Sequence, residues 1–92
     1  MEIIWTKHAE ERQKEWEKIL GVTRQEVENL ANYPEQIVHG DMDALVAQTK
    51  TRKGLLRVPF VEIEGRRKVL TVYWTSKIER YWKGEKENED KI

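Results

Sequence analysis

The chain has no cysteine, only two prolines and two histidines, and five glycines among its 92 residues. Without cysteine there is neither a disulfide framework nor a thiolate zinc site. Two histidines without cysteine also argue against a zinc site, so we expect no metal and no other cofactor. No apolar run approaches the roughly eighteen residues that cross a membrane, and the N-terminus MEIIWTKHAEER is not typical of a signal peptide. We therefore expect a cytoplasmic protein without a membrane partner.

The net charge of zero conceals a strong separation of charge along the chain. Residues 1–49 contain five Lys/Arg and ten Asp/Glu, whereas residues 50–84 contain ten Lys/Arg and three Asp/Glu. The basic segment is also the aromatic, strand-like part of the sequence. Phosphates must be neutralised by cations and nucleobases can stack on aromatic rings. This segment therefore predicts a polyanion-binding face.

Two helices are predicted in the first third of the chain. Thr6 can cap a helix over residues 7–20, and Gly21 is typical of the position just past a helix end. Thr23 begins a capping box that predicts a second helix over residues 24–32. The apolar stripe expected to face the core from the first helix is Ala9, Trp16, Ile19 and Leu20.

From residue 35 onward the hydrophobic period changes from 3.6 to 2, which predicts strands. Pro59 within the third of these strands indicates an edge position or a bulge. Alternation places Arg57, Val69 and Tyr73 on the face opposite the core, and Leu70 on the core face. The predicted strands are 2–6, 36–39, 44–50, 55–63 and 66–76, with a final helical turn within 78–83.

These elements predict an α+β fold in the order β-α-α-β-β-β-β. Two helices should pack on one face of a mainly antiparallel sheet of four to five strands, and the other face should be open. We expect one domain over residues 1–83, with a single modest core, and a disordered polar tail over 84–92.

Three segments together resemble a known family. The first strand ends in Trp-Thr-Lys-His8-Ala9 with Arg12 one turn later, the second helix ends in Tyr33-Pro-Glu, and the meander ends in Val69-Leu-Thr-Val-Tyr73-Trp. Over residues 2–82 this resembles small prokaryotic proteins of unassigned function that group with the BrnT and RelE/ParE-like toxins. The resemblance implies a RelE-like fold and a metal-independent, mRNA-cleaving endoribonuclease of a toxin–antitoxin system. It also implies a cognate antitoxin and RNA or the ribosome as partners.

Two other functions remain open. The ParE branch of the same superfamily poisons DNA gyrase, so the resemblance equally allows a gyrase-directed toxin. The neutral net charge instead favours a non-catalytic module that binds RNA or a protein through the same face.

Metal-free RNA cleavage requires a base for the 2′-hydroxyl, cations for the phosphorane and an acid for the leaving oxygen. His8 and either Tyr73 or Tyr81 are the acid and base candidates, whereas the arginines would hold the phosphate and Lys77 would assist. The candidate catalytic residues are His8, Arg12, Arg57, Tyr73, Arg80 and Tyr81.

His8, Arg12 and Arg57 also have ordinary structural interpretations. Arg12 can pair with Glu11 or Glu15, and His8 can form a hydrogen bond near the helix start. Arg57 can protect an edge strand. Because an unshifted tyrosine titrates near ~10, a neighbouring arginine would have to lower the pKa of Tyr73 before it could act as a base.

The remaining cations flank two predicted hairpin turns. Consecutive turns lie at opposite ends of a sheet, so these residues predict two basic patches that can contact the RNA backbone or an acidic antitoxin tail. They are equally typical of solvated hairpin ends. The candidate RNA-binding residues are Lys50, Arg52, Lys53, Arg66, Arg67, Lys68 and Lys77.

Overall fold

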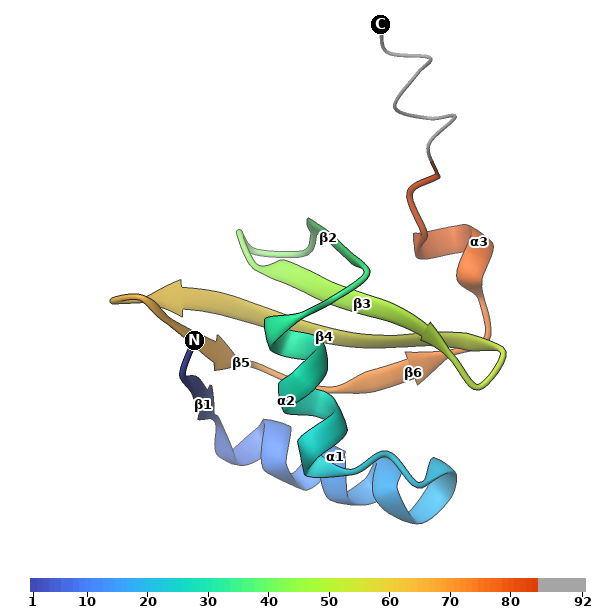
Figure 1. Cartoon of the computed structure of the whole chain (residues 1–92), viewed down its shortest axis with the longest axis horizontal. Coiled ribbons are helices and arrows are strands. Elements are labelled where there is room, and N and C mark those ends of the chain that lie inside the picture. Colours follow the sequence, from blue (N-terminus) through green and yellow to red (C-terminus); the bar gives the residue numbers. More distant parts are fainter. Residues whose placement is uncertain (85–92) are drawn as a thin grey trace, which may run out of the picture.

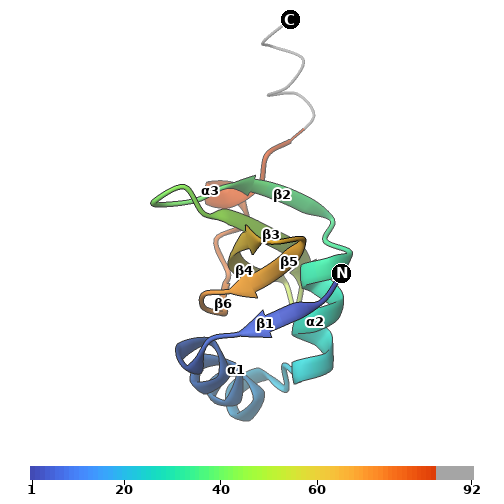
Figure 2. The same cartoon turned by 90° about the vertical axis from the view of Figure 1, so that its left-hand side faces the viewer.

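A mixed six-stranded sheet carries two helices on one face and a short third helix on the other (Figures 1 and 2). The computed structural model of the chain describes residues 1–84. Its elements are β1 (Ile3–Trp5), α1 (Lys7–Leu20), α2 (Arg24–Asn32), β2 (Gln36–His39), β3 (Leu45–Thr51), β4 (Gly54–Ile63), β5 (Arg66–Val69), β6 (Tyr73–Thr75) and α3 (Ile78–Tyr81).

The predicted α+β class is confirmed, and both predicted helices begin and end as expected. The sheet differs from the prediction because it has six strands rather than four to five. The predicted tail lies, from residue 85 onward, outside the described residues.

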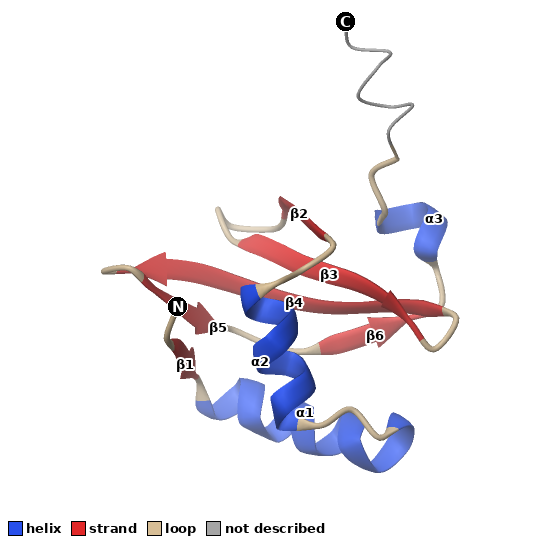
Figure 3. Cartoon of the chain, viewed as in Figure 1, coloured by secondary structure: helices blue, strands red, loops and turns tan. Residues whose placement is uncertain are grey.

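The sheet runs in the order β1-β5-β4-β3-β2, and β6 continues the line of β5 along β4 (Figure 3). Among the strands of residues 1–84, β1 alone is parallel to its neighbour, β5. All other pairs are antiparallel. The longest strand, β4, is therefore central, with β3 on one side and β5 and β6 on the other.

The helix ends follow the capping chemistry of the sequence. The Thr6 hydroxyl accepts a hydrogen bond from the Ala9 amide at 3.1 Å, and Thr23 does the same for Glu26. Gly21 closes α1 in the left-handed region at φ 73°, which costs glycine little.

The buried side of α1 is displaced from the predicted stripe. Ile19 was wrongly assigned to the core, since its side chain is 66% exposed. Gln13 lies there instead, buried, where its amide donates to the Val22 carbonyl at 2.9 Å. Residues 9, 13, 16 and 20 share one helix face at the spacing of 3.6 per turn, whereas Ile19 lies beside it.

The predicted strand over residues 66–76 is interrupted opposite Pro59. Phe60 pairs with Val69 and Arg57 pairs with Tyr73, so three residues of the interrupted strand face two of β4. One extra residue is the count of a β-bulge. The Pro59 carbonyl accepts a hydrogen bond from the Leu70 amide at 2.9 Å. In an antiparallel pair the nitrogen and the carbonyl of one residue point toward the same neighbouring strand, so the Pro59 nitrogen, which carries no hydrogen, also faces the bulge segment. The bulge was anticipated, but the edge position was wrong because β4 is central.

The bulge reverses the side-chain alternation on one flank of the sheet. Val69 was expected on the open face but is buried in the core, and Leu70 is only half-buried. Tyr73 still shares a face with Arg57. The core lies between this sheet and the two long helices, and its largest members are Val22, Val27, Leu30, Leu56, Val58, Phe60, Val69 and Val72.

Candidate functional site

Arg57 occupies the centre of the sheet face that α1 and α2 do not cover. It extends from the middle of β4 and is only 6% exposed. Its Nε donates to Gln48 Oε1 at 2.8 Å, and its Nη1 donates to the Tyr73 hydroxyl. The guanidinium also lies 4.0 Å from the ring centroid of Tyr81. The face predicted to be open is therefore partly closed over Arg57.

The charge of Arg57 has no carboxylate partner in the described part of the chain. The ion pairs between residues 1 and 84 involve Arg12, Arg24, Arg52 and Arg66 instead. A buried cation normally requires an anion, because removing it from water costs several kcal/mol. Neutral acceptors and aromatic faces compensate only part of this cost, so the site favours an incoming anion.

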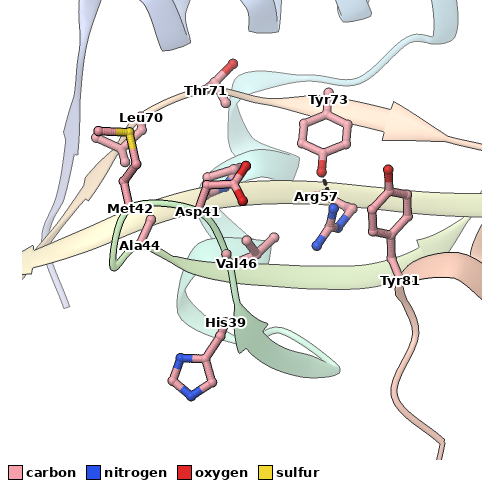
Figure 4. Close-up of a pocket in the computed structure, with 12 residues that line it drawn as sticks. His39, Asp41, Met42, Ala44, Val46, Arg57, Leu70, Thr71, Tyr73 and Tyr81 are labelled. Atoms are coloured by element: carbon pink, nitrogen blue, oxygen red, sulfur yellow. Dashed lines mark hydrogen bonds between the residues drawn. The ribbon is translucent and has the colours of Figure 1, made fainter.

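A pocket of about 560 Å³ opens beside Arg57 (Figure 4). Its walls come from the β2–β3 turn, β3, β4, the bulge segment and α3. The Tyr73 hydroxyl and the Tyr81 ring both lie against the guanidinium, and Asp41 overhangs the pocket from the turn. Apolar side chains complete the lining, chiefly Met42, Ala44, Val46, Pro59 and Leu70.

Part of the Arg57 guanidinium is available to a ligand. Nη2 makes no hydrogen bond to residues 1–84, and it is not among their buried unpaired atoms. Because Arg57 lines the pocket, this nitrogen is the part of the guanidinium that a ligand in the pocket can approach. Its N–H groups can donate to an anion without breaking the bonds to Gln48 and Tyr73.

The environment of Tyr73 raises its pKa above the ordinary value of 10.0. Burial of the phenol is the main cause, and the charge of Tyr81 and Asp41 adds to it, whereas the charge and hydrogen bond of Arg57 oppose it. The neighbouring arginine required by the sequence hypothesis is thus present, but desolvation outweighs it. At neutral pH the hydroxyl keeps its proton, so Tyr73 suits a proton donor and not a base.

Two buried or half-buried amides attach α3 to the sheet beside Arg57. Gln48 Nε2 donates to Gln36 Oε1 at 2.7 Å and to the Tyr81 carbonyl at 3.1 Å. Gln36 in turn accepts from the Lys83 amide at 2.9 Å and donates to the Lys83 carbonyl at 2.6 Å. These bonds hold the Tyr81 ring over the guanidinium.

His8 and Arg12 lie outside this pocket. His8 Nε2 is 3.1 Å from the Thr71 hydroxyl, and Arg12 forms an exposed ion pair with Glu15 at 3.3 Å. The structure thus brings Arg57, Tyr73 and Tyr81 together, with Arg80 5.7 Å from the Tyr81 ring on its exposed side. Thr71 lies between His8 and the pocket, because it contacts His8 and also lines the pocket.

Two of the candidate RNA-binding cations are built into the fold. Arg52 Nε donates to the Leu20 carbonyl at 2.9 Å, and its Nη atoms bind both carboxylate oxygens of Glu26 at 2.6 and 2.9 Å. Arg67 Nη1 donates to the Ala31 carbonyl at 2.5 Å while its guanidinium covers the Phe60 ring. Both guanidinium groups are therefore already engaged in contacts within the fold.

The other candidate cations are more accessible. The β3–β4 and β4–β5 turns lie at opposite ends of the sheet, as expected, so the basic residues form two groups (Figure 1). In the first, Lys50 covers the Trp82 ring at 4.3 Å, while Lys53 and Lys77 are exposed. In the second, Arg66 pairs with Glu64 at 3.7 Å and Lys68 is half-buried.

Sequence reasoning missed Gln48 and Asp41 of this site. Gln48 lies directly opposite Arg57 in the β3–β4 register. The available signal was an amide directly after the apolar residues 45–47 of one predicted strand, together with an arginine within the apolar part of the next. Asp41 gave no signal, because a turn aspartate is ordinary and only the fold brings this turn over Arg57.

No family model, no curated protein and no solved structure matches the chain. The resemblance to RelE/ParE-like toxins therefore depends on the quoted residues alone. Within residues 1–84, no three His, Asp or Glu side chains gather where they could hold a metal ion. None of the helices described is both long and apolar enough to cross a bilayer.

Proposed function

We propose that the protein is a toxin-like endoribonuclease that works without a metal and receives a backbone phosphate of RNA at Arg57. The observation that carries this proposal is the buried guanidinium of Arg57, which lines a pocket and has no carboxylate partner among residues 1–84. The planar fork of arginine matches a phosphate in geometry and charge. Tyr81 supplies an aromatic ring in the same pocket, on which a flanking base can stack.

The geometry suggests a role for each group. A base removes the 2′-hydroxyl proton, the 2′-oxygen bonds to phosphorus, and the bond to the 5′-oxygen breaks as that oxygen takes a proton. Arg57 stabilises the charge of the phosphorane, and Tyr73, which keeps its proton, donates to the leaving oxygen. The carboxylate of Asp41 is the base candidate, because it overhangs the pocket and acts electrostatically on Tyr73. The products are a 2′,3′-cyclic phosphate and a 5′-hydroxyl.

The exposed cations extend this site along the sheet. Lys77 directly precedes α3 and Arg80 lies 5.7 Å from the Tyr81 ring, while Lys50 lies near the end of β3 and Lys53 in the turn that follows it. Such residues neutralise backbone phosphates without reading the bases. A cognate antitoxin with an acidic segment would compete for the same cations, which is how we propose that the cytoplasmic toxin is held inactive.

A second function, a binding module without catalysis, is favoured by one observation. Among residues 1–84, neither a carboxylate nor an imidazole forms a hydrogen bond with Tyr73 or Arg57. A site with a cation and a proton donor but no aligned base binds an anion without cleaving it. This module would bind RNA with a salt dependence equivalent to a few phosphates.

Incubation of an end-labelled, unpaired RNA with the protein in excess EDTA separates the two functions. We expect cleavage with cyclic phosphate ends, and a loss of about 10²–10³-fold for Arg57→Gln. Arg12→Gln is the matched control, since this arginine is exposed and outside the pocket, and we expect it to cleave at the wild-type rate. Binding without cleavage would establish the module instead, and unchanged cleavage by Arg57→Gln would refute the proposed site.

A further inference from the structure

Gln48 contributes every hydrogen-bonding group of its side chain to the Arg57 site. The residue is fully buried on β3, directly opposite Arg57. Its Oε1 accepts from Arg57 Nε at 2.8 Å, and its Nε2 donates to Gln36 Oε1 and to the Tyr81 carbonyl. The hydrogen bonds fix the amide orientation, because the oxygen alone can accept from arginine.

The neutrality of this acceptor has a consequence for Arg57. A carboxylate is the usual partner of a buried guanidinium, and glutamate has the same length and shape as glutamine. A glutamate at this position would neutralise Arg57 within the fold and leave little attraction for a ligand. The amide instead orients the guanidinium and leaves its charge uncompensated.

We infer that Gln48 is a positioning residue that keeps Arg57 oriented and available to a phosphate group. The inference rests on the proposed function only in taking Arg57 as the anion site, and it does not require cleavage. It explains why the buried stretch of β3, residues 46–48, ends in an amide at this register position. It also predicts that one exchange of an atom, the Nε2 nitrogen of Gln48 for the oxygen of a glutamate, would close the site to anions.

The Gln48 side chain also holds Tyr81, the residue whose aromatic ring lines the pocket, in position. Through its Nε2 it holds the Tyr81 carbonyl, and through Gln36 it is linked to the backbone of Lys83. The Tyr81 ring is thereby kept 4.0 Å from the Arg57 guanidinium. Gln48 therefore positions both the cation and the ring from one point.

Titration with inorganic phosphate, followed through the Nε–H NMR signal of Arg57, tests this inference. We expect phosphate to move the signal in the wild type, and Gln48→Glu to weaken binding by at least about tenfold, because charges in contact inside a protein interact strongly. Gln25→Glu is the matched control. It makes the same exchange of an amide for a carboxylate, but on the exposed side of α2 on the other face of the sheet, where the Gln25 amide donates to Asn29 Oδ1 at 3.0 Å. We expect it to stay within about twofold of the wild type, since that charge is screened by solvent.

Gln48→Asn provides a second test if Gln48→Glu does not fold. Asparagine keeps the site neutral but is one methylene too short to reach both Arg57 and Tyr81. We expect weaker phosphate binding and faster exchange of the Arg57 Nε–H, whereas a purely structural role would lower stability alone. Wild-type phosphate affinity in either variant, or no phosphate response in the wild type, would overturn the inference. RNA cleavage that is lost in Arg57→Gln would still support the proposed function even where free phosphate gives no response, so the two failures are distinguishable.

Discussion

Replacing Arg52 by glutamine should destabilise the fold without weakening RNA binding. Arg52 lies at the β3–β4 turn and was a candidate phosphate ligand on sequence grounds. In the structure it joins this turn to the end of α1, through the Leu20 and Gly21 carbonyls, and to Glu26 of α2. The hydrogen bond with Glu26 raises the pKa of Arg52, so the residue stays charged at any assay pH.

The expected magnitude follows from these contacts. The Arg52 side chain is 27% exposed, so its ion pair with Glu26 contributes at most about 1 kcal/mol. The bond to the Leu20 carbonyl at the end of α1 adds about 1 kcal/mol, because it satisfies an otherwise unpaired group. A loss of about 2 kcal/mol corresponds to a urea midpoint lower by about 1–2 M for a domain of this size.

Lys53→Gln is the matched control for this prediction. Lys53 is the next residue of the same turn, is exposed, and has a positive φ of 61° like the 56° of Arg52. Glutamine therefore replaces a long cation under the same backbone conformation in both variants. We expect Lys53→Gln to keep wild-type stability and to weaken RNA binding, the opposite of Arg52→Gln. Equal urea midpoints for the two variants would refute the structural role of Arg52.

Three further changes test other parts of the structure. The pKa of Tyr73 is higher in the folded protein than in the unfolded chain, so the protonated phenol stabilises the fold below pH about 10, and this contribution is lost as pH rises further. The difference in free energy of unfolding between wild type and Tyr73→Phe, measured by urea unfolding, should therefore shrink only above that pH. Gly54→Ala would place a Cβ 2.3 Å from the Thr75 carbonyl oxygen and should cost several kcal/mol, about 3 or more, whereas Gly84→Ala meets open space and should cost little by thermal melting. Arg67→Met keeps an unbranched stem over Phe60 and removes an Nε that is buried without a partner among residues 1–84, but it also removes the hydrogen bond to the Ala31 carbonyl. Stability should therefore fall by about 1 kcal/mol and RNA affinity should stay unchanged, whereas a large loss of RNA affinity would return Arg67 to the binding surface.

Local signals determined most of the fold. Thr6, Gly21 and Thr23 mark helix ends through contacts within three or four residues, so the sequence alone locates α1 and α2. The strands follow from alternation, which is equally local. The division of the last strand is different, because its cause is Pro59, which acts across the sheet on Leu70. Pro59 has no N–H to donate, and only the pairing register of β4 with its neighbouring strands shows which residues lie opposite it.

The candidate site was predicted less completely because charge in a sequence does not show what covers it. Arg52, Arg57 and Arg67 look alike as cations among strand residues. One clamps a turn, one is buried beside a pocket, and one covers a phenyl ring. His8 and Arg12 formed the sharpest sequence pair, yet they lie in the helix layer and away from the pocket.

The proposed endoribonuclease activity depends on the charge of Arg57, which is not paired with any carboxylate of residues 1–84. Induced expression in a bacterial host, with growth and mRNA integrity measured together, tests this most directly for wild type, Arg57→Gln and the control Arg12→Gln. We predict growth arrest with cleaved mRNA for wild type and Arg12→Gln, and neither effect for a folded Arg57→Gln. Arrest and cleavage that persist in Arg57→Gln would contradict the claim.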